Sequence, residues 1–281
     1  MSEAVPRGRV TLRSPDGHTE AVIDAEAGGR VARLRIRDLD VILTEGFGAI
    51  AWGAYPMVPW AGRLRDGRFE WDGRTIAVER TMPPNAIHGT ALYRPWRVTD
   101  ARPSAVTLEV DLAPAWPLGG RAVHRVELDD DELRAILEVD ATDRPMPAIV
   151  GWHPWFPRRL ARGGELELDF RPTAMLVRGD DHLPTGAVVD PPPGPWDDAF
   201  TGVVAPPRLR WPGAISVEIR SDAPYWVVYT EQPHAIAVEP QTGPPNGLAT
   251  GDATIVEPGR PLVASMAIAW LEDDRPPRQG P

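Results

Sequence analysis

Residues 125–139 read RVELDDDELRAILEV, and this stretch decides the fold class of the chain. Apolar and polar residues alternate on both sides of the acidic run at residues 129–131. A period of two puts the apolar side chains of an extended segment on one face, which is the pattern of a half-buried strand. The acidic run between the two halves suits an exposed turn. The stretch therefore predicts a β-hairpin.

The same period of two recurs on both sides of this hairpin. Residues 68–79 read RFEWDGRTIAVE and predict a second hairpin, because Asp72-Gly73 forms a two-residue turn that accepts positive φ. No segment sustains an apolar stripe of helical period beyond about two turns. Other alternating segments are RVTLRS, GRVARLRI, AVTLEVDL, RAVHRVEL, GELELDF, ISVEIRS and LVASMAIAW. We predict an all-β, mainly antiparallel protein with few short helices, built as a large sandwich or a barrel.

The chain shows no domain boundary. Its 281 residues suffice for one large β domain, and its 33 prolines and 26 glycines divide it into short segments throughout. The most proline-rich stretch, VVDPPPGPWDDAF, lies between predicted strands and is interpreted as an ordered loop. We therefore predict a single domain over residues 1–281, with a disordered tail at about residues 272–281.

Charge and hydropathy exclude several classes of partner. A net charge of -10 argues against nucleic acid, whose phosphates need a basic face. The N-terminus, MSEAVPRGRV, lacks the apolar core of a signal peptide, and no stretch approaches ~18 apolar residues. We expect a cytoplasmic protein that binds neither nucleic acid nor a membrane.

Two residue types are missing from the chain. There is no cysteine, which excludes disulfides, thiol nucleophiles and cysteine-ligated metals. All 30 basic residues counted as lysine or arginine are arginine. Schiff-base and pyridoxal phosphate chemistry both need a lysine amine, so both are excluded as well.

Glu239 is the residue that fits its surroundings least well. It follows the apolar run at residues 235–238, which predicts a buried strand, and it precedes Pro240. A buried carboxylate is rare unless it is paired or functional. Proline has no backbone N–H, so we expect strand pairing to end at Pro240.

Three other positions stand beside apolar or aromatic runs. His153 lies in VGWHPWF, His88 in NAIHGTALYRPW, and Arg63 follows the loop YPMVPWAG. A histidine in such a run is either a core residue or a catalytic one, and an arginine in a turn is usually solvated. The other four histidines have no chemical context that singles them out: His18, His124, His182 and His234.

Six motifs occur in an order that resembles the aldose 1-epimerases, also called galactose mutarotases. Along the chain they are PMVPWAGRLRDGRFEWDG, NAIHGT, GWHPWF, LPTGAVVD, WDDAFTG and VEPQTGPPN. The resemblance spans about residues 20 to 270. It implies a β-supersandwich and an isomerase that interconverts the α and β anomers of a hexose. Such a reaction opens and closes a hemiacetal without a redox step or a stable covalent intermediate, so no cofactor is expected.

The resemblance also implies roles for individual residues. Glu239 matches the general base that takes the proton of the C1 hydroxyl, and His153 matches the general acid that protonates the ring oxygen. Three further residues match sugar-binding positions: His88, Arg63 and Asp197, with Asp198 beside the last. Aromatic faces for the sugar, or alternatively core packing, are expected from Trp60, Trp152, Trp155 and Phe156.

One position departs from the family pattern. The family's usual Asn-Arg pair is Gly62-Arg63 here, so one expected side-chain contact is missing. This departure marks a divergent branch and leaves the identity of the sugar open.

Several alternatives remain at the level of sequence. Two histidines and a carboxylate could hold a metal ion. Glu239 with Asp197 or Asp198 could form the carboxylate pair of a glycoside hydrolase. The chain could also bind carbohydrate without turnover, or act on a hexose 6-phosphate through extra cations near Arg63. We favour an aldose 1-epimerase that acts on a free aldose and has no metal.

Overall fold

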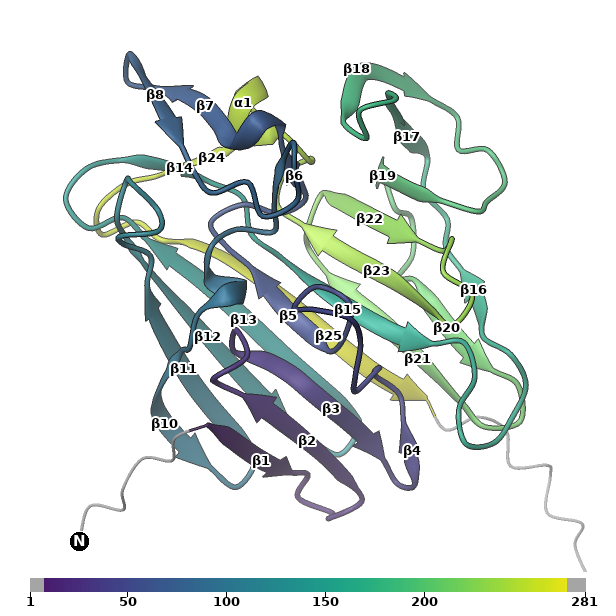
Figure 1. Cartoon of the computed structure of the whole chain (residues 1–281). Helices are drawn as coiled ribbons and strands as arrows, with labels where there is room; N and C mark the ends of the chain where they lie inside the picture. The colour runs from purple at the N-terminus through teal and green to yellow at the C-terminus, as the bar shows by residue number, and fades with distance from the viewer. Residues whose placement is uncertain (1–7, 272–281) are drawn as a thin grey trace, which may run out of the picture.

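The computed structural model describes residues 8–271, and the predicted disordered tail at residues 272–281 lies outside this range. Two large antiparallel sheets lie face to face and form a sandwich, with smaller hairpins above it (Figure 1). One short α-helix, α1 (Gly247–Thr250), and two short 3-10 helices, η1 (Arg65–Gly67) and η2 (Ala91–Tyr93), are the helical elements of the described residues. The all-β, mainly antiparallel prediction is confirmed.

The larger sheet has 11 strands in the order β1-β2-β3-β5-β15-β23-β22-β19-β17-β18, with β4 paired to β3. Its outer strands are β1 (Arg9–Arg13), β2 (Thr19–Asp24), β3 (Arg30–Ile36), β4 (Leu39–Asp40), β17 (Ala174–Arg178) and β18 (Pro184–Val189). Its central strands are β5 (Ala54–Met57), β15 (Gly151–Pro157), β23 (Ala235–Gln241), β22 (Tyr225–Tyr229) and β19 (Asp197–Thr201).

The second sheet has 8 strands in the order β10-β11-β12-β13-β25-β21-β20-β16. They are β10 (Arg97–Arg102), β11 (Ala105–Asp111), β12 (Arg121–Leu128), β13 (Glu132–Asp140), β25 (Leu262–Leu271), β21 (Ile215–Ser221), β20 (Arg208–Trp211) and β16 (Glu167–Asp169). Three two-stranded sheets complete the fold: β14 (Met146–Ala148) with β24 (Thr254–Val256), β6 (Arg63–Leu64) with β9 (Ala86–Ile87), and β7 (Arg68–Trp71) with β8 (Arg74–Ala77).

Both hairpins predicted from the sequence are present. In the first, Leu128 of β12 pairs with Leu133 of β13 across the acidic turn. In the second, Trp71 of β7 pairs with Arg74 of β8 around Asp72-Gly73. Both central turn residues have positive φ, at 50° for Asp72 and 68° for Gly73, as a tight hairpin turn of this kind requires.

The central strands β15 and β23 are buried on both faces. Trp152, Phe156 and Val238 point into the core between the two sheets. Their neighbours Trp155 and Ala237 point to the opposite face, where a second apolar cluster lies. Because neighbouring residues of a strand point to opposite faces, a strand buried on both sides appears in sequence as a continuous apolar run.

Pro240 does not end strand pairing, contrary to the sequence prediction. Strand β23 continues to Gln241, and Trp226 of β22 pairs with Pro240. The ladder to β15, by contrast, passes from the pair Gly151–Gln241 directly to the pair Trp155–Ala237. In an antiparallel strand the N–H and C=O of one residue point to the same neighbour. A missing N–H therefore interrupts pairing on one side only.

Candidate active site

A cavity of about 440 Å³ lies on the face of the larger sheet that is turned away from the second sheet. Its floor comes from central strands β15, β23, β22 and β19, and its walls come from the hairpin β17–β18 and from loops. All five residues predicted from the sequence line this one cavity: Arg63, His88, His153, Asp197 and Glu239. They come from five different segments of the chain, and the fold brings them together.

Strand register brings the central residues into one row. His153 lies directly opposite Tyr55 of β5, and Glu239 lies directly opposite Val227 of β22. The imidazole Nε2 of His153 is 3.1 Å from the carboxyl Oε1 of Glu239. This contact occurs in the gap of the β15–β23 ladder, where Pro154 and Pro240 both lack a backbone N–H.

Glu239 and His153 are both buried, with side chains only 3% and 6% exposed. Burial raises the pKa of Glu239 well above its usual range, and the nearby charge of Asp197 raises this pKa further. Burial lowers the pKa of His153 to about 3. Desolvation disfavours the charged form of each group. The pair therefore favours its neutral form, a carboxylic acid beside an imidazole.

The pair is held by neighbouring side chains. The ring of Tyr55 stacks on His153 at a centroid distance of 4.9 Å, and Trp155 lies 5.0 Å away at a tilt. The amide Nε2 of Gln241 donates to Oε2 of Glu239 over 3.2 Å. One carboxyl oxygen thus contacts the histidine, while the other has an amide donor.

His88 lies edge-on to His153, with ring centroids 5.1 Å apart. Its backbone has a positive φ of 58°, which is uncommon outside glycine, and its N–H donates to the carbonyl of Gly62. Burial lowers the pKa of His88 well below its usual value, so the ring is neutral at pH 7. Its Nδ1, like that of His153, is buried without a hydrogen-bond partner among residues 8–271. Such atoms are candidates to bind a ligand.

Asp197 and Arg63 lie close to each other in the lining of the cavity. Oδ2 of Asp197 is 4.0 Å from Nη1 of Arg63 and 2.5 Å from Nη1 of Arg178. Asp198 also contacts Arg178, with 3.5 Å between Oδ1 and Nε. Burial raises the pKa of Asp197, against the opposing effect of the two arginines. The charge of Asp197 raises the pKa of Glu239, so Asp197 is the better candidate of the two aspartates for the sugar-binding position.

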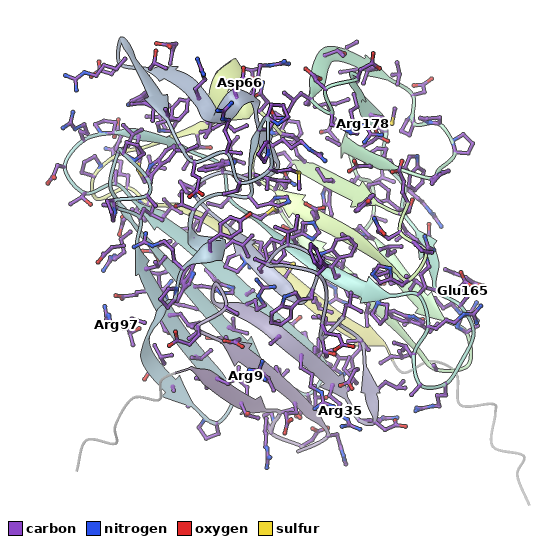
Figure 2. The ribbon with its side chains drawn as sticks, in the orientation of Figure 1. Arg9, Arg35, Asp66, Arg97, Glu165 and Arg178 are labelled. Atoms are coloured by element: carbon purple, nitrogen blue, oxygen red, sulfur yellow. The ribbon has the colours of Figure 1, made fainter. Side chains whose placement is uncertain are left out.

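The sequence analysis missed Arg178, His182 and His234, which also line the cavity. Arg178 lies where the hairpin β17–β18 rises beside β19 (Figure 2). The Nη1 of Arg178 is 3.2 Å from Nδ1 of His182. No local pattern distinguishes these residues, because Arg178 and His182 reach the cavity through the hairpin β17–β18 and His234 reaches it through the loop between β22 and β23.

His124 shows the alternative outcome for a buried histidine. Its Nδ1 lies 3.0 Å from the carbonyl oxygen of Gly29, and its Nε2 accepts from the indole of Trp152. Both ring nitrogens are satisfied inside the core, so His124 is a structural residue. Among the predicted aromatics, Trp155 lines the cavity, whereas Trp60, Trp152 and Phe156 pack in the core.

The structure leaves no room for a side chain at Gly62, the position at which the resemblance implies an asparagine. Its φ is 71°, and a Cβ at this position would lie 2.8 Å from Cβ of Pro245. Real Cβ atoms do not approach a neighbour so closely, so Pro245 occupies the space that a side chain would need.

Two kinds of feature are absent from the described residues. No helix within residues 8–271 is long and apolar enough to cross a membrane. Within the same range, no group of three or more histidine, aspartate or glutamate side chains is arranged to hold a metal ion.

The fold is that of the galactose mutarotase-like proteins, with a buried carboxyl–imidazole pair in its cavity. A galactose mutarotase-like protein from Clostridium acetobutylicum superposes with a TM-score of 0.82 at 16% identity, over 91% of this chain and 93% of that one. The galactose 1-epimerase from Lactobacillus acidophilus NCFM superposes with a TM-score of 0.73 at 14% identity, over 95% and 99%. At such identities, these likenesses establish the fold.

The family follows from the sequence comparison. The family model for aldose 1-epimerase matches residues 9–202, and the chain belongs to this family. The Escherichia coli (strain K12) protein YihR, described as uncharacterized, is 23% identical over 235 residues, which cover 73% of this chain and 75% of YihR. Identities of this size fit the divergent branch expected from Gly62.

Proposed function

We propose that this protein is an aldose 1-epimerase that interconverts the α and β anomers of a free hexose by general acid–base catalysis. The observation that carries the proposal is the 3.1 Å contact between His153 and Glu239 in the buried floor of the cavity. Ring opening removes a proton from O1 and adds one to O5, and both oxygens are bonded to the same carbon. An acid and a base must therefore lie side by side, as these two groups do.

The pair would carry one proton through the whole cycle. The neutral pair first forms its ion-pair tautomer, as the carboxyl proton of Glu239 moves across the 3.1 Å contact to His153. In ring opening, the Glu239 carboxylate then takes the O1 proton and the His153 imidazolium gives its proton to O5. This step converts a buried ion pair into a neutral pair, which desolvation favours. After the C1–C2 bond rotates, His153 takes the proton back from O5 while the Glu239 carboxylic acid returns a proton to O1. The ring closes on the other carbonyl face, and no proton need come from solvent.

The remaining residues would orient the sugar. The buried and unpartnered Nδ1 of His88 is suited to hydrogen-bond the sugar near the ring oxygen, and Arg63 and Asp197 are suited to bind ring hydroxyls. Trp155 and Tyr229 meet edge to face at 5.7 Å and supply apolar surface in the same cavity. Sugars present both polar hydroxyls and apolar C–H faces, and this lining matches both.

The charges around Arg63 favour a neutral hexose over a hexose 6-phosphate. Arg65, the nearest extra cation in sequence, pairs with Asp181 over 2.6 Å at an exposed position. Arg178 does line the cavity, but Asp197 and Asp198 already neutralise it. A dianionic phosphate would meet these two carboxylates as well as the guanidinium groups, which costs electrostatic energy.

Polarimetry tests the proposal directly. Freshly dissolved α-D-glucose and α-D-galactose should lose their excess optical rotation faster with the protein than in buffer alone. A panel that includes hexose 6-phosphates and α-glycosides separates the alternatives, because a preference for the phosphate or a release of reducing sugar would each identify another reaction. A lack of acceleration for every aldose and aldose phosphate tested would contradict the proposal.

A further inference from the structure

Arg30 is a fully buried cation, and its three hydrogen bonds within the described residues all go to backbone carbonyl groups. It begins strand β3 and is only 1% exposed. Its Nε donates to Ala27 over 2.7 Å, its Nη1 to Trp52 over 2.8 Å and its Nη2 to Ala49 over 2.8 Å. Burial lowers the pKa of Arg30 to about 10, so the group remains charged at pH 7. A buried charge is costly, and carbonyl oxygens offset that cost only when they are held in place.

Two of these carbonyl groups belong to the rim loop, which we define as residues 46–52. The rim loop lies between β4 and β5, and Gly46, Phe47, Ile50 and Ala51 line the cavity. Phe47 is 97% exposed, so the outer half of the loop has little packing of its own. The guanidinium of Arg30 reaches the carbonyl groups at both ends of the inner half, Ala49 and Trp52, in a rigid planar geometry.

The rim loop is joined in turn to the rings around His153. The carbonyl of Ile50 accepts the hydroxyl of Tyr55 over 2.9 Å and the indole N–H of Trp155 over 2.8 Å. Both of these rings contact His153, at 4.9 Å and 5.0 Å between centroids. The guanidinium carbon of Arg30 also lies over Trp52 at 4.0 Å and over Tyr55 at 5.2 Å.

We propose that Arg30 is a positioning residue that fixes the rim loop and, through Ile50, sets the ring planes of Tyr55 and Trp155 that support His153. Arg30 is not one of the described residues that line the cavity. The expected effect of Arg30 on kcat rests on the proposed function. The expected effect of Arg30 on the rim loop and the two rings rests on the contacts alone. Small displacements of a catalytic group reduce the rate strongly, by up to about 10²-fold for 1 Å.

Matched substitutions on one strand test the inference. Arg30→Met removes the three donors while keeping a long side chain, and Arg30→Lys keeps the charge without the planar fork. Arg33→Met is the control, because Arg33 lies on the same strand but pairs with Asp40 at a half-exposed position. Two quantities are measured for each folded variant: kcat with KM for the best sugar, and hydrogen exchange of the Trp155 indole N–H by NMR.

We expect Arg30→Met to lower kcat about 10- to 100-fold per folded molecule and to speed exchange of the Trp155 indole at least about tenfold. Arg30→Lys should lower kcat and speed exchange of the Trp155 indole by smaller factors. If Arg30→Met does not fold, Arg30→Lys is the variant on which both quantities are measured. Arg33→Met should leave both unchanged.

Three outcomes would overturn the inference. One is wild-type kcat and exchange in a folded Arg30 variant, and another is an equal effect of Arg33→Met. The third needs no variant: exchange of the Trp155 indole in the wild type as fast as that of an exposed indole. If the wild type accelerates no sugar, the proposed function fails, but the exchange measurements still decide whether Arg30 holds the rim loop.

Discussion

The core and the cavity each contain a buried histidine on a central strand, and the two histidines differ in how their nitrogens are used. His124 has a partner on each ring nitrogen, from the Gly29 carbonyl and the Trp152 indole. His153 has Glu239 on Nε2 and a buried Nδ1 without a partner among the described residues. Both have lowered pKa values, about 4 for His124 and about 3 for His153, with burial as the largest cause.

The comparison shows that burial and a lowered pKa are common to both histidines and do not distinguish a cavity histidine from a core one. The distinguishing feature is an incomplete hydrogen-bond set next to a cavity, together with a second buried group of opposite acid–base type. His124 has neither of these features, whereas His153 has both. The predictions below follow from that difference.

The largest expected effect is on the acidic partner in the cavity. Glu239→Gln should remove most of the rate acceleration, by about 10²- to 10⁴-fold, because the amide cannot take the O1 proton. Folding should be retained, since the amide replaces an acid whose buried form is already neutral. Polarimetry measures the rate, and thermal unfolding measures the fold. Glu138→Gln, at a surface ion pair with Arg125, is the control and should keep the wild-type rate. A wild-type rate for Glu239→Gln would refute the base assignment.

Substituting the two histidines tests the comparison itself. His153→Asn should lower the rate about 10²-fold or more with little loss of stability. His124→Asn should do the opposite, with a loss of about 1–3 kcal/mol in unfolding free energy from the unsatisfied core groups and a normal rate per folded molecule. Urea unfolding and polarimetry on the same samples give both numbers. The distinction between core and cavity fails if the two variants show the same pattern.

Substitution of the two aspartates should have different effects on KM, by up to about one order of magnitude. Asp197→Asn should raise KM about tenfold, because it weakens a charge-assisted hydrogen bond to a sugar hydroxyl. Asp198→Asn should change KM by less, since among the described residues Asp197, and not Asp198, forms an ion pair with Arg63. Initial rates over a range of sugar concentrations measure this difference. A larger effect of Asp198→Asn would reverse the assignment.

The pH dependence of stability should differ between the two regions. The folded-state pKa of His124 lies near 4, below the usual 6.5, so its contribution is full above pH 6.5 and is lost as the pH falls toward 4. At pH 4.5 the resulting loss of unfolding free energy from His124 is about 3 kcal/mol. His153 also has a lowered pKa, so its contribution to stability is likewise lost on acidification. Glu239 has a raised pKa, so the contribution of Glu239 to stability is full below pH 4.5 and is lost as the pH rises through its folded-state pKa. On acidification, the stability gained from Glu239 therefore partly offsets the stability lost from His153, whereas nothing of this kind offsets the loss from His124 in the described part of the core.

Urea unfolding at pH 7 and pH 4.5 checks this sign. His124→Gln should flatten the loss of stability on acidification, and Glu239→Gln should steepen it. The same slope in both variants and the wild type would show that neither region controls the acid response.

The last prediction concerns Gly62, at the edge of the cavity. Gly62→Asn restores the family residue, but its Cβ would meet Pro245, and overpacking of this kind costs about 1–3 kcal/mol. Adding Pro245→Gly should recover part of that stability, measured as the shift in unfolding temperature. Full stability of Gly62→Asn alone would show that the loop of Pro245 gives way.

Local pattern was sufficient for both predicted hairpins, but residues 188–200, interpreted as a loop, begin in strand β18 and end in strand β19. Alternation is a property of a few neighbouring residues, so residues 125–139 and Asp72-Gly73 predicted their hairpins without any distant information. Motif order likewise pointed to Glu239 and His153. The effect of Pro240 was predicted wrongly, because a missing N–H identifies a lost hydrogen bond without saying which neighbouring strand loses it.

Pairing between distant strands decided the rest. Tyr55, His153 and Glu239 meet because β5, β15 and β23 are adjacent in one register, and a shift by one residue would turn each side chain to the other face. Arg178 reached the cavity through a hairpin, and Arg30 found its carbonyl partners in a loop 19 to 22 residues away. The sequence by itself determined the strand period and the candidate acid and base. Only the tertiary structure decided which buried histidine keeps a free nitrogen beside a carboxyl group, because burial and hydrogen-bond partners are set by segments far apart in the chain.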